Sequence, residues 1–550
     1  HLQGAAAHAS EAFQLINQYR LPVKPEGFNS YTEETKTFYR WMTRYRKQLD
    51  DWQALDPSEL LDRVSRRMQQ GHIPLPEEIQ LYGFDDLSPQ LRDWLTFLEN
   101  HEVPVRFSPF EPQPVEPAAF EEWITQKQAT VQKYEDANEE VVQCARWVRS
   151  IYKSGETIGI VVPDLENYRG IIEREFKAEL APKSVFPWEE IPLPFNISLG
   201  TPLSHEPMVH LALLLLSQAS KRIPLLTFST LINSPFLKCP EKEKPFRREL
   251  DWTQRGKSPT HVYLPQILSP EDQERGPVLT GLLKALEKKW MDDTAFRLPS
   301  QWARKIANLL KELEWPAGSG TLSSHQYQAL ESWKSSLDSL ATLDRVSGKI
   351  NRHQAVANLT HIVGETLFQP QTHEEPIQVV GLLESAGMEF DHLWIMGCHA
   401  DTLPPVPRPN PFLPFLTHQK PCRLPHSTAE RELAFTEQTL YRLAHACRQM
   451  IFSFPAWKGE AEMVPSPLIA PRLTDPHAIH RDTSFRYQDH PDFAVPLETL
   501  TDFSPIPVSD EEKSSIRGGT GIIKHQALCP FQAFAVHRLS SQHREFSDLD

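Results

Sequence analysis

The sequence predicts an α/β protein whose mostly parallel sheet is interrupted in the chain by a large helical segment. Short apolar runs of strand length occur at residues 157–162, 377–383 and 392–396. Both faces of these runs are apolar, which is typical of strands buried in a mostly parallel sheet. Between the first and second runs, residues 217–370 show a helical pattern instead. We therefore expect one α/β domain built from two separate parts of the chain.

Residues 1–130 are expected to form a helical N-terminal region. Apolar residues recur at helical spacing in 11–19, 35–48 and 57–69, and the Pro-rich stretch 103–117 is expected to be a connector. The opening residues, HLQGAAAHASEAF, contain no basic segment and no cleavage pattern, so they do not resemble a signal peptide. Because they read as the inside of a helix, we expect the chain to be cut from a longer protein.

The first part of the predicted α/β domain covers residues 131–216. The apolar run at 157–162 is followed by Asp164, a residue type that begins helices. The apolar side of the following helix consists of Leu165, Tyr168, Ile172 and Phe176. Residues 194–198 and 207–216 complete this part.

Residues 217–370 are expected to be a mainly helical insertion. The stretches 277–290, 299–315 and 324–343 each show a 3.6-residue apolar period and are rich in good helix formers. The insertion therefore separates the two parts of the α/β domain without adding strands to its sheet.

The second part of the α/β domain covers residues 371–460. After the strands, Ser427 and Glu430 predict a capping box that opens a helix. This helix is expected to continue to Cys447, and a buried strand is expected at 450–454. Two further segments complete the chain, namely a linker rich in Pro, Asp and Ser at 461–515 and a last segment at 516–550.

The loop between the strands at 377–383 and 392–396 contains the first candidate site. Its residues are Ser385, Ala386, Gly387, Met388, Glu389 and Phe390. Open α/β sheets bind ligands at the carboxyl ends of their strands. A loop at a strand end therefore makes Gly387 and Glu389 candidates for contact with a nucleotide.

This loop and the helix after it resemble a segment of RecB-like, AddB-like and UvrD-like superfamily 1 helicases. That segment reads roughly T-x-H-x-A-K-G-L-E-F-D, an apolar strand, G and P, and then E-E-R-R-L-x-Y-V-x-x-T-R-A. The matching residues here are 385–391, Gly397, Leu403, Pro404, 430–435 and Thr439. The resemblance implies a helicase-like, RecA-like domain, in which Glu389 corresponds to a ribose-contacting glutamate. A purely structural loop carboxylate is the alternative.

Two departures from the helicase pattern argue against ATP hydrolysis. The family's lysine falls on Ala386, and the arginine that follows the threonine falls on Leu440. Cations at such positions hold phosphate or stabilise the charge that develops on it. Their loss predicts a nucleotide site that survives only as a relic.

Two further matches occur in the expected order along the chain. Residues 157–216 are similar to the opening of the second motor-like domain of RecB-like and AddB-like proteins, and 217–370 corresponds to the helical insertion of that family. Residues 521–534, GIIKHQALCPFQAF, resemble the start of the carboxyl-terminal nuclease domain of AddB-like DNA repair proteins. The resemblance implies that the catalytic residues of this PD-(D/E)XK nuclease, and its divalent metal (Mg²⁺), belong to sequence beyond residue 550. We expect no catalytic residue in the chain itself.

The six cysteines show no C-x-x-C spacing, which fits a reducing cytoplasm. Five are expected to be small buried apolar residues. The resemblance singles out Cys529, because the matching cysteine of AddB-like nucleases is the first of four ligands to an iron–sulfur cluster. The other three ligands are not in this sequence, and a cysteine without a cluster is the alternative.

A basic and aromatic stretch is the candidate DNA-binding surface. Its residues are Arg40, Trp41, Arg44, Tyr45, Arg46 and Lys47, which combine cations for the backbone with rings for base stacking. The alternative is an amphipathic helix with Trp41 and Tyr45 packed inward. The formal charge of −15 does not favour a surface that broadly coats DNA, so DNA contact is expected to be local.

Three functions remain open at this point. The first is a helicase-like, ATPase-inactive scaffold that binds single strands or duplex ends of DNA for a DNA repair exonuclease. The second is a non-catalytic subunit that packs against a partner helicase subunit, as RecC and AddB do. The third, an ATP-dependent helicase, is disfavoured by Ala386 and Leu440. No run of eighteen apolar residues occurs, so no membrane association is expected.

Overall fold

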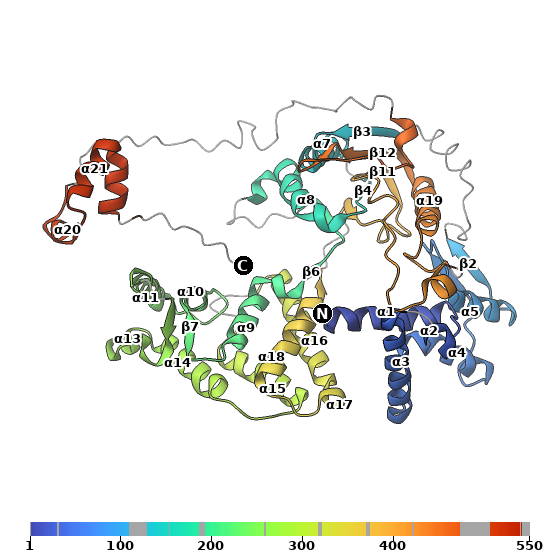
Figure 1. Ribbon diagram of the computed structural model, residues 1–550, viewed down its shortest axis with the longest axis horizontal. Helices are drawn as coiled ribbons and strands as arrows, with labels where there is room; N and C mark the ends of the chain where they lie inside the picture. The colour runs from blue at the N-terminus through green and yellow to red at the C-terminus, as the bar shows by residue number, and fades with distance from the viewer. Residues whose placement is uncertain are drawn as a thin grey trace. The chain divides into compact units, whose positions relative to one another are not determined.

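The computed structural model describes residues 2–29, 32–108, 129–152, 155–185, 193–257, 260–316, 322–369, 375–420, 423–473, 507–539 and 541. The chain divides into two compact units, His1–His490 and Pro491–Asp550. Figure 1 shows the helices and strands of each. No helix in the described ranges combines the length and the apolar composition needed to cross a membrane.

Six parallel strands form the sheet of the α/β domain. The predicted α/β class is confirmed, but the edge strand β3 was not predicted. The order of the strands across the sheet is β3-β12-β11-β4-β10-β5, and every neighbouring pair is parallel. The two separate parts of the chain therefore form a single sheet (Figure 1). The strands are β3 (Thr130–Tyr134), β4 (Ile158–Val161), β5 (Phe195–Ile197), β10 (Ile377–Val380), β11 (Phe390–Ile395) and β12 (Cys447–Pro455).

Helices cover both faces of this sheet. α7 (Ala137–Ile151), α8 (Leu165–Leu180) and η2 (Pro182–Val185) follow β3 and β4, and α19 (Ala429–His445) precedes β12. Successive residues of β11 alternate between the two cores, because Trp394 packs with α7 and α8 whereas Leu393 and Ile395 pack with α19. Burial on both faces explains why these strands read as continuous apolar runs.

The sheet has a topological switch point between β4 and β11. The chain leaving β4 enters α8 on one face, whereas the chain leaving β11 leads to α19 on the other face. β4 and β11 are hydrogen-bonded neighbours. A crevice therefore opens beyond their carboxyl ends, where open α/β sheets commonly bind ligands.

Residues 201–368 form a separate helical body between β5 and β10. It is entered and left through the antiparallel pair β6 (Thr201–Pro202) and β9 (Leu367–Phe368), and β7 (Arg222–Pro224) pairs with β8 (His261–Tyr263). Its helices are η3 (Leu203–His205), α9 (Pro207–Ser217), α10 (Leu225–Asn233), η4 (Glu241–Glu243), α11 (Lys244–Gly256), α12 (Leu264–Ile267), α13 (Pro270–Arg275), α14 (Pro277–Leu286), η5 (Glu287–Met291), α15 (Pro299–Glu312), α16 (Ser324–Thr342), α17 (Asp344–Ser347) and α18 (Arg352–Glu365).

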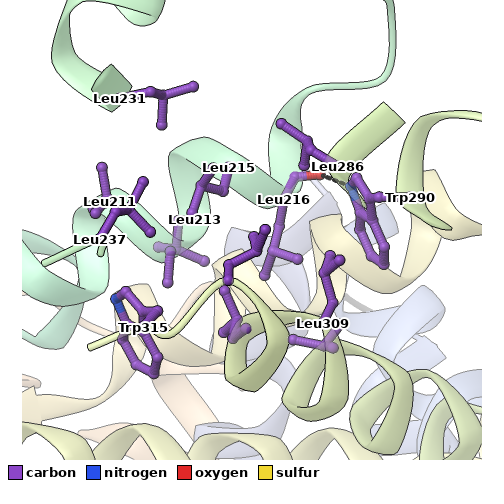
Figure 2. Close-up of a cluster of buried hydrophobic side chains, with 14 of the residues drawn as sticks. Leu211, Leu213, Leu215, Leu216, Leu231, Leu237, Leu286, Trp290, Leu309 and Trp315 are labelled. Atoms are coloured by element: carbon purple, nitrogen blue, oxygen red, sulfur yellow. Dashed lines mark hydrogen bonds between the residues drawn. The ribbon is translucent and has the colours of Figure 1, made fainter. Parts of the chain in front are cut away.

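The core of the helical body is rich in leucine and tryptophan (Figure 2). Buried indoles keep their hydrogen bonds, because Nε1 of Trp290 donates to the carbonyl oxygen of Leu216 at 2.9 Å and Nε1 of Trp315 donates to that of Met208 at 3.0 Å. The apolar residues of α9, such as Leu211, belong to this core. The prediction that residues 207–216 belong to the α/β domain is therefore wrong, since a buried helix shows no periodicity that identifies its partner.

The N-terminal region is less purely helical than the sequence predicts. It contains α1 (Leu2–Gln18), α2 (Pro25–Asn29), α3 (Glu33–Trp52), η1 (Pro57–Glu59), α4 (Leu60–Gln69) and α5 (Pro89–Glu99). β1 (Ile79–Tyr82) and β2 (Val105–Ser108) form a parallel pair around α5. The described start of the predicted 103–117 connector is thus a strand. Strands of four residues are too short to show a period of two, and the Pro-rich context hides them.

Two predicted helix boundaries need correction. The cap of α19 is Thr428, whose side chain accepts a hydrogen bond from the N–H of Arg431, so the predicted Ser427–Glu430 capping box is wrong. The helix ends at His445, and Cys447 already begins β12. An apolar residue at the junction fits the helical and the strand pattern equally well, so periodicity places this boundary poorly.

The remaining described elements are short. The part of the predicted linker at 461–473 contains β14 (Ala461–Glu462), which pairs with β13 (Trp457–Lys458), and η7 (Ala470–Arg472). Residues 474–506 of this linker lie outside the described ranges. A π-helical turn, η6 (Phe415–Gln419), precedes α19. The second unit contains α20 (Asp510–Ser515), α21 (Thr520–Leu528), α22 (Pro530–Ala533) and η10 (Phe534–Arg538).

Candidate nucleic-acid interface

The predicted basic and aromatic stretch lies on α3. The helix is capped by Thr32, whose side chain accepts a hydrogen bond from the N–H of Thr35. Its buried side contains Phe38 and Met42, and this spacing is that of one helical face. The predicted DNA-binding residues lie outside that buried face, all of them exposed except the half-buried Arg46: Arg40, Trp41, Arg44, Tyr45, Arg46 and Lys47.

Trp41 and Tyr45 form one wall of an aromatic groove between α1 and α3. The opposite wall includes Phe13 of α1, whose ring lies 5.3 Å from that of Tyr45 in an edge-to-face arrangement. The groove has a volume of about 490 Å³ and is lined mainly by apolar atoms. Trp41 and Tyr45 remain 41% and 39% exposed, so they neither pack fully inward nor project freely into solvent.

Hydrogen bonding fixes the Tyr45 ring in this groove. Its hydroxyl donates to Oδ2 of Asp56 at 2.9 Å, while Oδ1 of Asp56 accepts from the N–H of Ser58. Burial, together with the hydrogen bond to Asp56, raises the pKa of Tyr45 to about 12. The phenol therefore stays protonated at neutral pH and holds the ring in one orientation.

Cations flank the aromatic groove. Arg46 lies over the Phe13 ring at 5.4 Å from its centroid. Within α3, Arg44 follows Trp41 by three residues and Arg40 by four, which makes Trp41 and Arg40 its neighbours on the helix surface. Neither Arg44 nor Lys47 has an ion-pair partner among the residues that the structure describes. The surface thus combines stackable rings with uncompensated positive charge.

The predicted nucleotide loop does not lie as the sequence argument requires. It begins at the carboxyl end of β10, but Gly387 and Glu389 lie three residues and one residue before the first residue of β11, and so at an amino end. Glu389 is exposed. The carboxyl-edge argument for Gly387 and Glu389 is therefore wrong, because the loop crosses from one edge of the sheet to the other.

The same loop is in close contact with the N-terminal region. Gly387 and Gly83 both have positive φ angles, +77° and +71°, and a Cβ atom on Gly83 would lie 2.4 Å from the backbone nitrogen of Gly387. A Cβ atom on Gly387 would lie 2.6 Å from the ring of Tyr82. The two backbones therefore meet at a distance that only glycine permits.

A buried arginine fixes this contact. Arg442 of α19 is 2% exposed and donates to Oδ1 of Asp85 at 2.6 Å, to Oδ2 at 3.0 Å and to the carbonyl oxygen of Ser385 at 2.9 Å. Arg431, eleven residues earlier on the same helix, pairs with Asp86 at 2.7 Å. Arg442 lies two residues beyond Leu440, at a position that the helicase pattern does not mark, so the resemblance could not identify it.

A polar crevice of about 850 Å³ lies at the topological switch point. Asp164 and Asn167 line it after β4, His399 and Asp401 after β11, and Lys458 after β12. His399 is 5% exposed, and its Nδ1 has no hydrogen-bond partner among the described residues. Burial lowers the pKa of this imidazole, so it is neutral at pH 7. The sequence motifs gave no signal for this crevice.

Glu140 of α7 holds the turn that leads from β11 to the crevice residue His399. Its carboxylate accepts hydrogen bonds from the N–H of Gly397 at 2.8 Å, the hydroxyl of Tyr168 at 2.8 Å and the hydroxyl of Ser453 at 2.5 Å. The side chain is fully buried, and burial raises its pKa despite these three donors. The carboxyl group thus connects the turn after β11 to α8 through Tyr168 and to β12 through Ser453.

Comparisons with known proteins do not identify the chain. No model of a known protein family matches it, and no curated protein has a significantly similar sequence. The resemblance to RecB-like and AddB-like helicases therefore depends on the motif residues alone.

The predicted iron–sulfur ligand lies in the second unit. Cys529 is exposed and occupies the N-cap position of α22. In the described part of the chain, no group of three or more His, Cys, Asp or Glu side chains has the geometry of a metal site. Of the other cysteines, Cys144, Cys398 and Cys447 are buried as predicted, and Cys239 is partly exposed. Cys422 lies outside the described ranges.

Proposed function

We propose that this chain is a helicase-like, ATPase-inactive scaffold that binds DNA, and that it is part of a DNA repair exonuclease of the RecB/AddB type. The aromatic groove of α1 and α3 is the observation that carries the DNA-binding part of this proposal. A nucleobase can stack on Trp41 or Tyr45 while Arg40, Arg44 and Lys47 contact phosphates. Such contacts tolerate many sequences, which suits a protein that guides DNA strands.

The fold supports the helicase-like part of the proposal. The six-stranded parallel sheet, with a helical body inserted between β5 and β10, is compatible with the RecA-like domain that the motif resemblance implies. The loop at 385–390, which resembles the helicase motif and is called the motif-like loop, is in contact with the N-terminal region. Arg442 binds Ser385 of this loop, and Gly83 lies against Gly387. Because backbone atoms fill this contact, we infer that the motif-like loop does not admit a nucleotide.

Nuclease chemistry is assigned to the whole protein and to Mg²⁺ held outside this sequence. Under this proposal the chain delivers a strand to that nuclease, and Cys529 supplies one ligand where an iron–sulfur cluster is present. The protein acts in the cytoplasm, where its cysteines remain thiols.

One observation favours the interaction-subunit alternative. In the described part of the second unit, Ile523, Leu528 and Phe531 are 72%, 69% and 73% exposed. Three large apolar side chains this exposed on a small helical unit favour burial against another surface, which a partner helicase subunit or a following domain can provide. The ATP-dependent helicase has no comparable support, because Ala386 and Leu440 replace both phosphate-directed cations.

DNA binding across a salt series tests the proposal directly. A labelled duplex with a single-stranded overhang is titrated with the chain, with and without ATP and Mg²⁺. We expect micromolar or tighter binding that weakens steeply with salt, is indifferent to ATP, and is accompanied by no ATP hydrolysis. Absence of binding at low salt overturns the scaffold in favour of the interaction subunit. ATP hydrolysis that is stimulated by DNA would instead support the ATP-dependent helicase.

A further inference from the structure

A basic groove runs along the helical body between η5 and α15. Its volume is about 800 Å³. The polar side chains that line it are five cations, two carboxylates and two amides: Lys288, Lys289, Arg297, Arg304, Lys305, Asp293, Glu312, Gln301 and Asn308. The whole chain carries a formal charge of −15, so this groove is positive against a negative background. Such local charge reversal marks a binding site for a polyanion.

The backbone that presents these side chains is firmly held. Trp290 of η5 is completely buried, and its indole donates to the carbonyl oxygen of Leu216 (Figure 2). Leu309 of α15 belongs to the same core and also lines the groove. The start of α15 is fixed as well, because the N–H of Ser300 donates to Asp344 at 2.8 Å. Both walls are therefore anchored in the leucine- and tryptophan-rich core.

Three charged residues hold one another at the inner end of the groove. Arg297 donates to both oxygens of Asp293 at 2.9 and 2.8 Å, and Lys305 also donates to this carboxylate. Burial opposes ionisation of Asp293, but these hydrogen bonds outweigh it and lower its pKa to about 2. Arg297 also lies 4.8 Å from the centroid of the Trp302 ring. This end of the groove is thus preorganised with excess positive charge.

The outer cations are available to a ligand. Lys288 and Arg304 are exposed, and neither forms a close ion pair within the described ranges, although Arg304 helps to lower the pKa of Asp344 through space. Lys289 pairs across the groove with Glu312 at 2.5 Å, but these side chains are 58% and 41% exposed. An exposed pair of this kind is weak, so a phosphate group can replace Glu312 as the partner of Lys289.

We propose that this groove binds the phosphate backbone of a DNA strand, as a second contact surface in addition to the aromatic groove. The inference rests on the proposed DNA-binding function. It adds the basic groove as a second DNA-binding site. Two features favour nucleic acid over an acidic protein. Gln301 and Asn308 can donate to phosphates and also read base edges. Phe296, which directly precedes Arg297, is 63% exposed and offers a ring for stacking.

A double charge reversal tests the groove. The variant Lys288→Glu/Arg304→Glu is compared with Arg345→Glu/Lys349→Glu, which changes the same charge at exposed positions of the helical body outside the groove. The probe is labelled oligothymidine, measured by anisotropy at several salt concentrations. We expect the groove variant to bind about tenfold more weakly at low salt and to lose about 1.4 from the slope of log K against log salt. The control variant should stay within about twofold.

A gain-of-binding variant completes the test. Glu312→Gln releases Lys289 and removes a negative charge, so oligothymidine should bind about two- to fivefold more tightly. Binding by the native chain with no response to either groove variant overturns the groove alone. No binding by the native chain overturns the DNA-binding function with it. Polyglutamate that binds the groove in place of oligothymidine identifies an acidic protein partner instead and overturns the proposal.

Discussion

Arg442 and Asp85 form a buried ion pair between residues 357 positions apart in the sequence, with N–O distances of 2.6 and 3.0 Å. The pair joins α19 of the α/β domain to the loop after β1 of the N-terminal region. Arg442 also donates to the carbonyl oxygen of Ser385. One guanidinium therefore connects the loop after β1, the loop at 385–390 and α19.

We predict that Arg442→Ala destabilises the protein by about 3–5 kcal/mol, because it leaves the Asp85 carboxylate buried without a partner. Urea unfolding followed by circular dichroism measures this change. Lys334→Ala is the control, since Lys334 pairs with Glu331 at the surface, where a loss of about 0–1 kcal/mol is expected. Equal losses for the two variants would show that the buried pair does not hold the regions together.

The contact between Gly83 and Gly387 gives a second prediction with a matched control. Gly83 and Gly71 share a φ angle of +71°, but a Cβ atom at Gly71 has nothing within 4 Å. Gly71→Ala should cost about 1 kcal/mol for the backbone strain alone. Gly83→Ala adds a collision with the Gly387 backbone and should cost about 2–4 kcal/mol. Similar losses of unfolding free energy would mean that the two loops separate in solution.

The sheet was predictable from the sequence because its central strands are buried on both faces. β4, β10, β11 and β12 each contain an apolar run, which is typical of a strand buried on both faces. The strands β1 and β2 escaped prediction because four residues are too few to show a period. α9 was placed in the wrong body for a related reason, since a helix that is apolar all round does not reveal which core it joins.

The residues of the candidate sites also fall into two groups, those that the sequence could identify and those that come together only in the fold. The cations and rings of α3 could be found because they are contiguous in sequence, whereas their partner Phe13 lies on another helix. Arg442 and Asp85 meet only in the fold, and a single sequence contains no signal that pairs them. The basic groove was equally invisible, because its cations come from η5, the following loop and α15, and are interleaved with carboxylates.

Trp41→Ala should weaken binding of oligothymidine by about 1–3 kcal/mol, the usual loss when a base loses its stacking partner. The salt dependence of binding should stay unchanged, because no cation is removed. Fluorescence anisotropy at several salt concentrations measures both quantities. Trp252→Ala is the control, since Trp252 is 77% exposed on α11, outside the aromatic groove. A loss shared by both variants would point to a general effect of removing tryptophan.

Glu140 gives a prediction about pH. Burial raises its pKa in the folded protein above the ordinary 4.5. Well below pH 4.5 the carboxyl group is protonated in the folded and the unfolded chain alike. As the pH rises above 4.5, the unfolded chain releases this proton first, so the contribution of Glu140 to stability declines until the raised pKa of the folded state is passed.

The variant Glu140→Gln isolates this effect, because its amide keeps the shape of the protonated acid and cannot titrate. Its Oε1 can accept from Gly397 and Ser453, while Nε2 donates to the Tyr168 oxygen. We expect the free energy of unfolding of the native protein, relative to that of the variant, to be constant well below pH 4.5 and to fall as the pH increases through 4.5 and above it. Urea unfolding at a series of pH values measures this difference. A difference that stays constant from pH 4 to 8 would show that Glu140 ionises as readily in the folded protein as in the unfolded chain, so that the three hydrogen bonds balance its burial. A difference that rises with pH would show that the hydrogen bonds outweigh the burial.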